Sequence, residues 1–457
     1  MAELTCFKAY DVRGRLGDEL NSDVVYRIGR AFAKYLAAKV VVIGGDIRLS
    51  TPELKNALTE GLTDEGCDVI DIGLVGTEEI YFATSYLKVD GGIVVTASHN
   101  PKDFNGLKFV REGSKPISGD TGLFKIKELA ERNEFTLSEH KGKRKIIDNS
   151  ASYVTHLLTY VDLAKLKPMK IVVNAGNGAA GHVIDALEQH FINEDVKVEF
   201  VKIQHKPDGN FPNGIPNPLL PDNRKATSDA IISSSANLGI AWDGDFDRCF
   251  LFDEKGDFIE GYYIVGLLAE SFLKKHPHEK IIHDPRLTLN TIDIVEKNKG
   301  IAVQSKTGHA FIKERMRAEN AIYGGEMSAH HYFRDFNFCD SGMIPWLLVA
   351  ELMSQSERSL SSMVSKRIKK YPSSGEINKI VLNPHILIEE IETKYLKQAI
   401  SVEKIDGLSM NFDGWRFNIR ESNTEALLRL NVESIDDQEL MEVKTKEILN
   451  MIESFKS

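Results

Sequence analysis

The feature that most constrains the fold is a strand–helix–strand pattern that occurs three times along the chain. An apolar run at residues 39–44 precedes a helical stretch at 51–65 and a second short strand at 68–72. The same order returns at residues 170–203 and again at 280–304. Continuous apolar strands that alternate with amphipathic helices are typical of parallel sheets covered on both faces. We therefore predict three related α/β domains, although such units are common enough to recur by coincidence.

The last part of the chain, from about Tyr371, has a different pattern. Several short strands adjoin one another there, and the helices stand apart at residues 386–399 and 437–455. Neighbouring strands with segregated helices favour a smaller α+β domain. The predicted fold class is thus α/β, with three related α/β domains and a C-terminal α+β domain. The predicted domains are residues 1–148, 149–253, 254–370 and 371–457.

Charge and cysteine usage exclude several classes of protein. The 457 residues include 57 Lys and Arg against 67 Asp and Glu, a net charge of −10, which argues against nucleic acid as a partner. No apolar run reaches the length of a membrane span, and the N-terminus lacks the apolar stretch of a signal peptide. The four cysteines are far apart and form no CxxC pair. These features predict reduced thiols and a cytoplasmic protein.

The most specific motif is DGDFDR, which lies between two apolar strands. Its three carboxylates, Asp243, Asp245 and Asp247, stand at every second position, so in an extended loop they can turn towards one point. Magnesium prefers oxygen ligands of this kind, whereas three carboxylates without a cation repel one another. Arg248 can contact a phosphate oxygen beside the metal. The alternative is an acidic surface turn, which the flanking apolar strands disfavour.

The motif TASHNP, residues 96–101, directly follows an apolar strand at 91–95. Ligands of α/β domains bind where strands end, and Ser98, beside His99, has that position. A serine hydroxyl attacks phosphorus poorly at neutral pH, but a phosphorylated serine can donate its phosphoryl group. On this motif alone, a turn that merely leaves the strand is the favoured interpretation.

Three further loops offer polar groups after strands, and each of them could equally be structural. In GGEMSAHH, Glu326 and Ser328 could hold sugar hydroxyls and His330 could transfer a proton. His309 lies at the turn of SKTGHAFIK. The loop RESNTE joins two strands and would form a phosphate cradle from Arg420, Ser422, Asn423 and Thr424.

Taken together, these motifs resemble those of the α-D-phosphohexomutase superfamily over essentially the whole chain. The similarity extends to FKAYDVRG at the N-terminus, to NGLK after TASHNP, and to PDGNFPNGIPNPLLP. Four active-site motifs in the family's order, one in each domain, are a highly specific combination. Within the superfamily the chain is most similar to the bacterial phosphomannomutases that feed GDP-mannose synthesis for capsule and O-antigen. The resemblance implies mixed sheets and four domains arranged around a central cleft.

The resemblance also implies a role for each motif residue. Ser98 would carry the phosphoryl group, and its oxygen would join the three aspartates in binding one Mg²⁺ per chain. Lys108 in NGLK matches the proposed general base, but His309 and His330 match histidines beside the reacting hydroxyl, so the base stays open among the three. Arg13 and Arg248 complete the predicted catalytic set. The predicted substrate-binding residues are Tyr10, Arg286, Glu326, Ser328, Arg420, Ser422, Asn423 and Thr424.

Some positions depart from the family's usual residues. Phe246 and Ala329 stand where glycine is common, and Ala426 stands where proline is common. Arg286 occupies a position where many relatives have lysine, an exchange that keeps the charge and alters the geometry. None of these changes removes a reacting group.

The predicted activity is the interconversion of mannose 6-phosphate and mannose 1-phosphate, with a hexose 1,6-bisphosphate as activator and intermediate. The predicted partners are small hexose phosphates, without nucleic acid or membrane, and the chain would be a monomer or a homodimer. A phosphoglucomutase or a dual-specificity enzyme is the alternative, because mannose and glucose differ only at C2 and the sugar loop is expected to read C3 and C4. A phosphosugar-binding protein without catalysis and a magnesium-dependent phosphatase are less favoured, because the chain has Ser98, Lys108 and all three aspartates.

Overall fold

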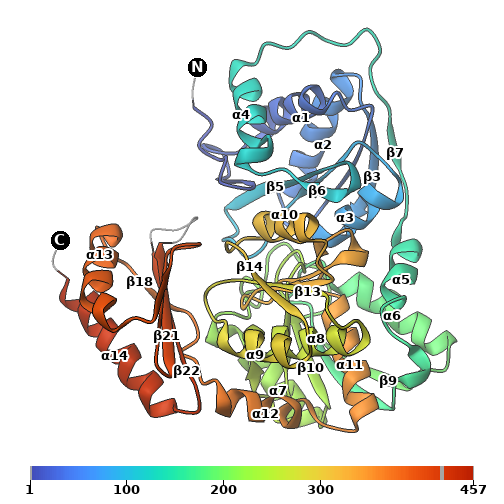
Figure 1. Ribbon diagram of the computed structural model, residues 1–457. Coiled ribbons are helices and arrows are strands. Elements are labelled where there is room, and N and C mark those ends of the chain that lie inside the picture. Colours follow the sequence, from blue (N-terminus) through green and yellow to red (C-terminus); the bar gives the residue numbers. More distant parts are fainter. Residues whose placement is uncertain (1–2, 422–426, 456–457) are drawn as a thin grey trace. The chain divides into compact units, whose positions relative to one another are not determined.

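The computed structural model describes residues 3–421 and 427–455, coloured along the chain in Figure 1. The chain divides into two compact units. The first contains Met1–Phe258 and Asp335–Glu357, and the second contains Ile259–Arg334 and Arg358–Ser457.

The first unit begins with a sheet in the order β1-β5-β4-β2-β3-β7, with β6 beside β5. Its central strands are parallel, whereas β5 runs antiparallel to both β4 and β1. The strands are β1 (Val12–Arg15), β2 (Val40–Gly45), β3 (Asp68–Leu74), β4 (Gly91–Val95), β5 (Phe104–Arg111), β6 (Lys115–Pro116) and β7 (Arg144–Ile146). The helices are α1 (Ser22–Leu36), α2 (Thr51–Asp64), α3 (Thr77–Tyr86) and α4 (Leu123–Arg132). Helices α1, α2 and α4 lie side by side (Figure 1) and enclose an apolar core with the sheet.

A second sheet of this unit has parallel strands β8 (Met169–Asn174), β9 (Val198–Ile203) and β10 (Leu238–Trp242). Strand β11 (Cys249–Phe252) pairs antiparallel with β10, and both strands are buried along their whole length. The helices are α5 (Ser150–Leu158), α6 (Gly181–Asn193), α7 (Lys225–Ser234) and α11 (Ile344–Ser356). The DGDFDR loop joins β10 to β11, so its carboxylates start at the carboxyl end of a central parallel strand.

The second unit repeats the strand–helix–strand arrangement. Strands β13 (Lys280–His283), β14 (Ile301–Gln304) and β15 (Tyr323–Gly325) are parallel, and β16 (His331–Phe333) pairs antiparallel with β15. The helices are α8 (Gly261–Lys275), α9 (Leu289–Lys297), α10 (His309–Glu319) and α12 (Leu360–Lys370).

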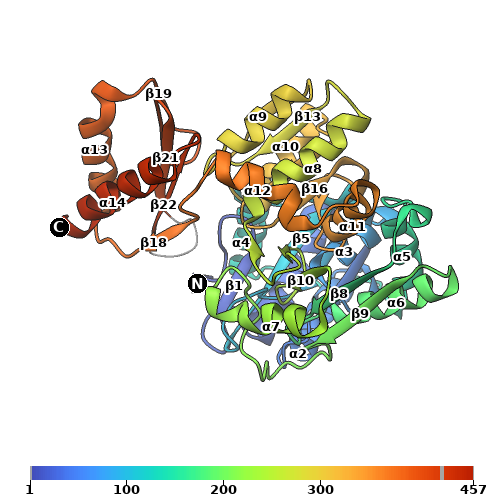
Figure 2. The same ribbon diagram turned by 90° about the horizontal axis from the view of Figure 1, so that it is seen from below.

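The C-terminal part of this unit is an antiparallel sheet in the order β18-β22-β21-β20-β19. The strands are β18 (Ile377–Lys379), β19 (Ser401–Glu403), β20 (Leu408–Phe412), β21 (Trp415–Glu421) and β22 (Leu428–Ser434). Helices α13 (Pro384–Tyr395) and α14 (Gln438–Ser454) cover one face, as Figures 1 and 2 show, and bury an apolar core against it.

The predicted fold class is confirmed: three α/β domains, whose sheets have antiparallel strands at an edge, precede a C-terminal α+β domain. Strand β18 ends at Lys379, because Ile380 and Leu382 turn out into solvent ahead of the helix that Pro384 begins. Within residues 3–421 and 427–455, no helix is both long enough and apolar enough to cross a membrane.

Candidate functional site

Ser98 lies in a tight buried turn three residues beyond the end of β4. Its side chain is buried, and its backbone has a φ of +49°, which is unfavourable for a residue with a Cβ. The Ser98 amide donates to Thr96 Oγ1 over 2.9 Å. Strained backbone of this kind persists only where its surroundings hold it in place.

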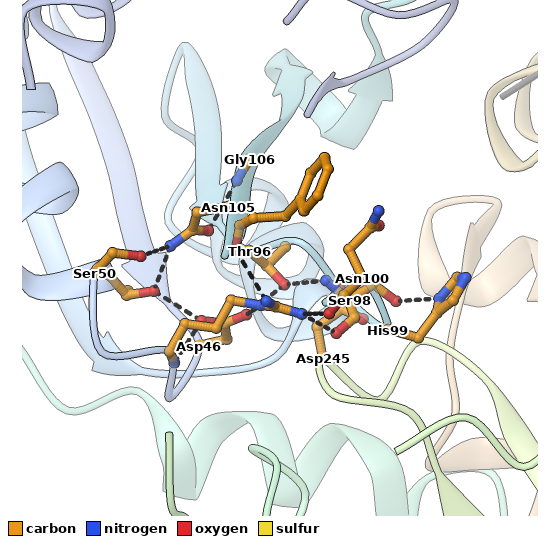
Figure 3. A network of polar contacts seen from close by, with 12 residues as sticks. Asp46, Ser50, Thr96, Ser98, His99, Asn100, Asn105, Gly106 and Asp245 are labelled. Carbon is orange, nitrogen blue, oxygen red and sulfur yellow. Dashed lines mark hydrogen bonds and ion pairs between the residues drawn. The ribbon is translucent and has the colours of Figure 1, made fainter. Parts of the chain in front are cut away.

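Figure 3 shows the serine turn together with Asp46, which directly follows the neighbouring parallel strand β2. Arg48, two residues further along, holds the turn. Its guanidinium donates four hydrogen bonds of 2.6–2.9 Å to the carbonyl oxygens of Ser98, Asn100, Pro101 and Phe104. Asp46 accepts from the Arg48 amide and from the hydroxyls of Thr51 and Thr96. Our sequence analysis missed both residues. The available signal was their position, because they follow β2 as TASHNP follows β4.

The three aspartates gather in one buried cluster beside Ser98, which we call the acidic centre. One carboxylate oxygen of each of Asp243, Asp245 and Asp247 lies within 4.8 Å of the others, and all three residues are at most 2% exposed. The Ser98 hydroxyl donates to Asp243 Oδ2 over 2.7 Å. The loop is not simply extended as expected, because Phe246 has a φ of +43°. That left-handed conformation explains why glycine is common at this position in the family.

Glycine is required at position 244 for a different reason. A Cβ at Gly244 would lie only 2.5 Å from the Ser98 carbonyl oxygen. The aspartate loop and the serine turn can therefore approach each other closely only when no side chain separates them.

Cationic side chains neutralise part of the charge of the acidic centre. Lys108 Nζ lies 2.7 Å from Asp245 Oδ2 and 2.6 Å from Asp247 Oδ2, and Arg248 Nε donates to Asp243 Oδ2 over 2.9 Å. Thr77, at the start of α3, donates its hydroxyl to Asp245. The buried Oδ1 atoms of Asp243 and Asp245 have no hydrogen-bond partner among the described residues. Oxygen atoms left over in this way fit a hard cation, so the three aspartates can hold a metal ion.

Burial and the neighbouring charges set the protonation of this site. Burial lowers the pKa of Lys108, but Asp245 and Asp247 outweigh it, so the pKa of Lys108 is raised and the ammonium is protonated. Burial, together with Arg248 and Arg13, lowers the pKa of His99 well below its ordinary value, so the imidazole is neutral. Arg248 donates to His99 Nδ1, which places the proton of that ring on Nε2. The protonated Lys108 donates hydrogen bonds to Asp245 and Asp247.

Arg13 and Tyr10 lie on the N-terminal segment of the same unit. Arg13 donates to Asp11 Oδ2 over 2.8 Å and to Asn100 Oδ1, two residues beyond Ser98. Tyr10 is half-buried just before this pair. The structure thus brings Arg13 to the serine turn.

In the second unit, Arg286 is brought together with the predicted sugar loop. Its guanidinium Nη2 lies 2.8 Å from Asp284 Oδ2, 3.2 Å from Ser328 Oγ and 3.5 Å from Glu326 Oε1. The two loops meet because they leave the adjacent parallel strands β13 and β15. The backbone of Ala329 has a φ of +71°, and this left-handed conformation explains why glycine is common at that position.

His309 and His330 also approach each other in this unit. Their ring centroids are 6.4 Å apart. The amide of Gly308 donates to Glu326 Oε1 over 3.0 Å, so the loop before α10 is tied to the sugar loop. Two candidate proton-transfer groups therefore lie beside the residues expected to hold a sugar.

Arg420 is buried at the end of β21 and faces Glu376, which lies just before β18. The other predicted members of the phosphate cradle, Ser422, Asn423 and Thr424, lie outside the described residues.

The comparisons with known proteins agree with this arrangement. Four family models match: phosphoglucomutase/phosphomannomutase alpha/beta/alpha domain I at residues 5–137, domain II at 151–256, domain III at 260–371 and the C-terminal domain at 389–449. A phosphomannomutase of Vibrio cholerae is 61% identical, covering 99% of each chain, and one of Escherichia coli K12 is 58% identical, covering 99% of this chain and 100% of the relative.

A solved structure agrees with them. A phosphoglucomutase/phosphomannomutase family protein from Burkholderia thailandensis superposes with a TM-score of 0.88 at 32% identity, covering 100% of this chain and 99% of the other. With all four domain models in order and whole-chain relatives near 60% identity, the chain belongs to the phosphoglucomutase/phosphomannomutase family.

Proposed function

We propose that this chain is a phosphomannomutase that interconverts mannose 6-phosphate and mannose 1-phosphate, supplying GDP-mannose synthesis. The observation that carries the proposal is the contact between the Ser98 hydroxyl and Asp243 inside the acidic centre. A carboxylate cluster that can hold a cation thus lies directly against the hydroxyl that would carry the phosphoryl group. Whole-chain identity to relatives named phosphomannomutase supports mannose as the sugar.

The proposed reaction has two phosphoryl transfers. In the first, the bond between phosphorus and Ser98 Oγ breaks as a hydroxyl oxygen of the sugar phosphate bonds to phosphorus, giving hexose 1,6-bisphosphate. The hydroxyl proton goes to a base, for which His309 and His330 are candidates, whereas Lys108 could accept it only after giving up the proton that it holds between Asp245 and Asp247. In the second transfer the other phosphate of the bisphosphate returns to Ser98. Such transfers depend mainly on positioning and on neutralising charge that is spread over the phosphoryl oxygens.

The proposed cofactor is one Mg²⁺ held by Asp243, Asp245, Asp247 and an oxygen of phospho-Ser98. When bound, the ion would neutralise charge on the transferring phosphoryl group. Two arginines of the chain position the site. Arg48 holds the serine turn, and Arg248 Nη2 lies 2.7 Å from Asp243 Oδ2, the oxygen that accepts from the Ser98 hydroxyl.

The proposed substrate groups lie on the second unit. Glu326 and Ser328 would hold sugar hydroxyls, and Arg286 and Arg420 would hold the phosphate that does not react, with Ser422, Asn423 and Thr424. The division at residues 148, 253 and 370 into four domains is part of the same proposal, and the spacing of the four family models supports it.

Transfer of labelled phosphate tests the carrier assignment. Wild-type chain incubated with ³²P-labelled hexose 1,6-bisphosphate should take up one phosphate per chain, and Ser98→Ala should take up none. Turnover of Ser98→Ala should fall at least about 10⁴-fold, as for other covalent nucleophiles. Ser233→Ala, on the exposed side of α7, is the matched control and should behave as wild type. Near-native activity of Ser98→Ala would refute the assignment.

The alternative is a phosphoglucomutase or a dual-specificity enzyme, since the sugar loop is expected to read C3 and C4, whereas mannose and glucose differ at C2. A coupled assay with mannose 1-phosphate and glucose 1-phosphate, each with a trace of bisphosphate, separates them. A strong preference for glucose would overturn the phosphomannomutase assignment and leave the mutase chemistry in place.

A further inference from the structure

Two cross-strand pairs on the same face of β21 and β22 have opposite electrostatic character. Arg416 pairs with Glu433, and their side chains form a buried ion pair of 2.9 Å. Four residues further along β21, Arg420 pairs with Arg429. Like charges directly opposite each other destabilise a sheet, so this second pair requires a nearby anion.

Glu376 provides that anion. Its carboxylate lies 3.1 Å from Arg429 Nη1, 3.6 Å from Arg420 Nη2 and 3.3 Å from Arg286 Nη1. We call Arg286, Arg420 and Arg429 the arginine cluster. Burial raises the pKa of Glu376, but the three arginines outweigh it, so the pKa is lowered and the carboxylate is ionised.

The arginine cluster retains unused hydrogen-bonding capacity. Arg286 and Arg420 are at most 3% exposed, and the buried Nε atom of each has no hydrogen-bond partner in the part of the chain that the structure describes. A buried guanidinium N–H without a partner is costly. A tetrahedral dianion offers more acceptors than one carboxylate, so both atoms point to a phosphate as the ligand.

We propose that Glu376 is the resident counter-ion of the arginine cluster and that a phosphate group must displace it to bind. This inference rests on the proposed function, because it takes the phosphate to be that of the hexose phosphate. Glu376 holds Arg420 over 3.6 Å and Arg286 over 3.3 Å, long enough contacts to be exchanged. Arg286 would stay in place during the exchange, since Asp284 holds it over 2.8 Å.

The consequence is that Glu376 lowers the affinity of the arginine cluster for phosphate. A phosphate that binds must compete with the ionised Glu376 carboxylate for the three arginines. A bisphosphate that must present first one phosphate and then the other to the same arginines has to be released between transfers. An internal competitor for these arginines makes that release faster without contact to the reacting atoms.

The test is the affinity for inorganic phosphate, measured by titration calorimetry on the full-length chain without added metal. Glu376→Gln should bind phosphate about 10-fold more tightly than wild type, because one competing negative charge at close range is removed. Glu390→Gln removes the same charge from the exposed side of α13 and should leave the affinity unchanged. In an Arg420→Gln background the gain from Glu376→Gln should disappear, which places the phosphate at this cluster.

Unchanged or weaker binding by Glu376→Gln would overturn the proposal, since it would make Glu376 a residue that orders the arginines for the ligand. A gain that persists with Arg420→Gln would overturn it as well, because the phosphate would then bind elsewhere. If Glu376→Gln does not fold, Glu376→Asp draws the carboxylate back by one methylene and should show a smaller gain in the same direction. Absence of mutase turnover in the wild type would refute the proposed function, whereas the phosphate affinities would still decide the role of Glu376.

Discussion

The acidic centre of the first unit and the arginine cluster of the second unit present the same electrostatic problem with opposite signs. Each gathers three like charges at a buried or half-buried position, and each includes an internal counter-ion, Lys108 in one and Glu376 in the other. In both, the counter-ion comes from a different segment of the chain than the charges that it neutralises.

The two sites differ in how tightly that counter-ion is held. Lys108 lies 2.6–2.7 Å from its two carboxylates, whereas the contacts of Glu376 with the arginines span 3.1–3.6 Å. Short contacts favour a fixed geometry, and long contacts favour exchange. We therefore expect the acidic centre, where phosphoryl transfer would occur, to keep a fixed geometry, and the arginine cluster to exchange its ligands.

The largest expected effect comes from breaking the acidic centre. Asp245→Asn removes a carboxylate that Lys108 and Thr77 both contact, and it should lower kcat by about 10³-fold, the scale of losing a main electrostatic contact. Steady-state assays over a range of Mg²⁺ concentrations measure it. Inorganic phosphate affinity should remain that of the wild type, because the arginine cluster is untouched. A loss of phosphate affinity in this variant would contradict the division of roles between the two sites.

The next largest effect is on stability and concerns the ion pair beside the arginine cluster. Arg416 donates to Glu433 and to the carbonyl oxygens of Pro285 and Arg286, and both side chains are buried. Arg416→Met removes the cationic partner of Glu433 but leaves the donors Tyr262, Thr288 and Leu289, so it should destabilise β21 and β22 by about 3 kcal/mol, the lower end for a broken buried ion pair. Hydrogen exchange of the amides of these strands measures the change. Arg416→Met with Glu433→Gln should recover part of it, and equal loss in both variants would show that the charge of Glu433 is not the cause.

A smaller effect is expected from a change of shape at constant charge within the arginine cluster. Arg420→Lys keeps the positive charge but loses the planar fork that binds two phosphate oxygens. We expect kcat/KM to fall by about 10- to 100-fold, mainly through KM, because one bidentate contact is worth roughly 2 kcal/mol. Lys108→Arg is the matched change in the acidic centre, where the tight contacts predict a loss in kcat instead. A loss in kcat alone for Arg420→Lys would remove the distinction between the two regions.

The order of the secondary structure was predictable from the sequence because the strands are buried on both faces. The runs at residues 170–174 and 280–284 have apolar centres, at 171–173 and 281–282, and β8 and β13 were found at those positions. The gathering of Ser98 with the aspartates was implied by the family resemblance alone, because β4 and β10 belong to different sheets and no strand order in the sequence relates them.

The sequence did not reveal the residues that position another residue. Arg48 and Glu376 lie in no motif that bears chemistry by itself, and the serine turn that Arg48 holds and the arginines that Glu376 contacts are 44 residues or more away along the chain. The left-handed backbone at Phe246 was equally hidden, since a bulky residue there gives no sign of a positive φ. Gly76 permits it, because a Cβ at that position would lie 2.2 Å from the Phe246 ring.

Another buried carboxylate, Glu78, forms no ion pair within the described part of the chain. Glu78, next to Thr77 at the start of α3, accepts hydrogen bonds from the hydroxyls of Tyr153 and Ser341 and from the amide of Gly342. These donors lower its pKa, but burial outweighs them and raises the pKa to about 8. Glu376 is half-buried, and three arginines lower its pKa instead. The counter-ion thus decides the protonation state.

The smallest expected effect follows from this difference. Because the pKa of Glu78 is raised on folding from an ordinary value near 4.5, the folded state binds the proton more tightly, and stability falls as the pH rises towards 8. Between pH 6 and 8 the first unit should lose about 2 kcal/mol, measured by urea unfolding, and Glu78→Gln should abolish that loss because its side chain does not ionise. Glu390→Gln should leave it intact. If Glu78→Gln loses as much stability as the wild type over this range, Glu78 is ionised throughout and its hydrogen-bond donors suffice in place of a cation.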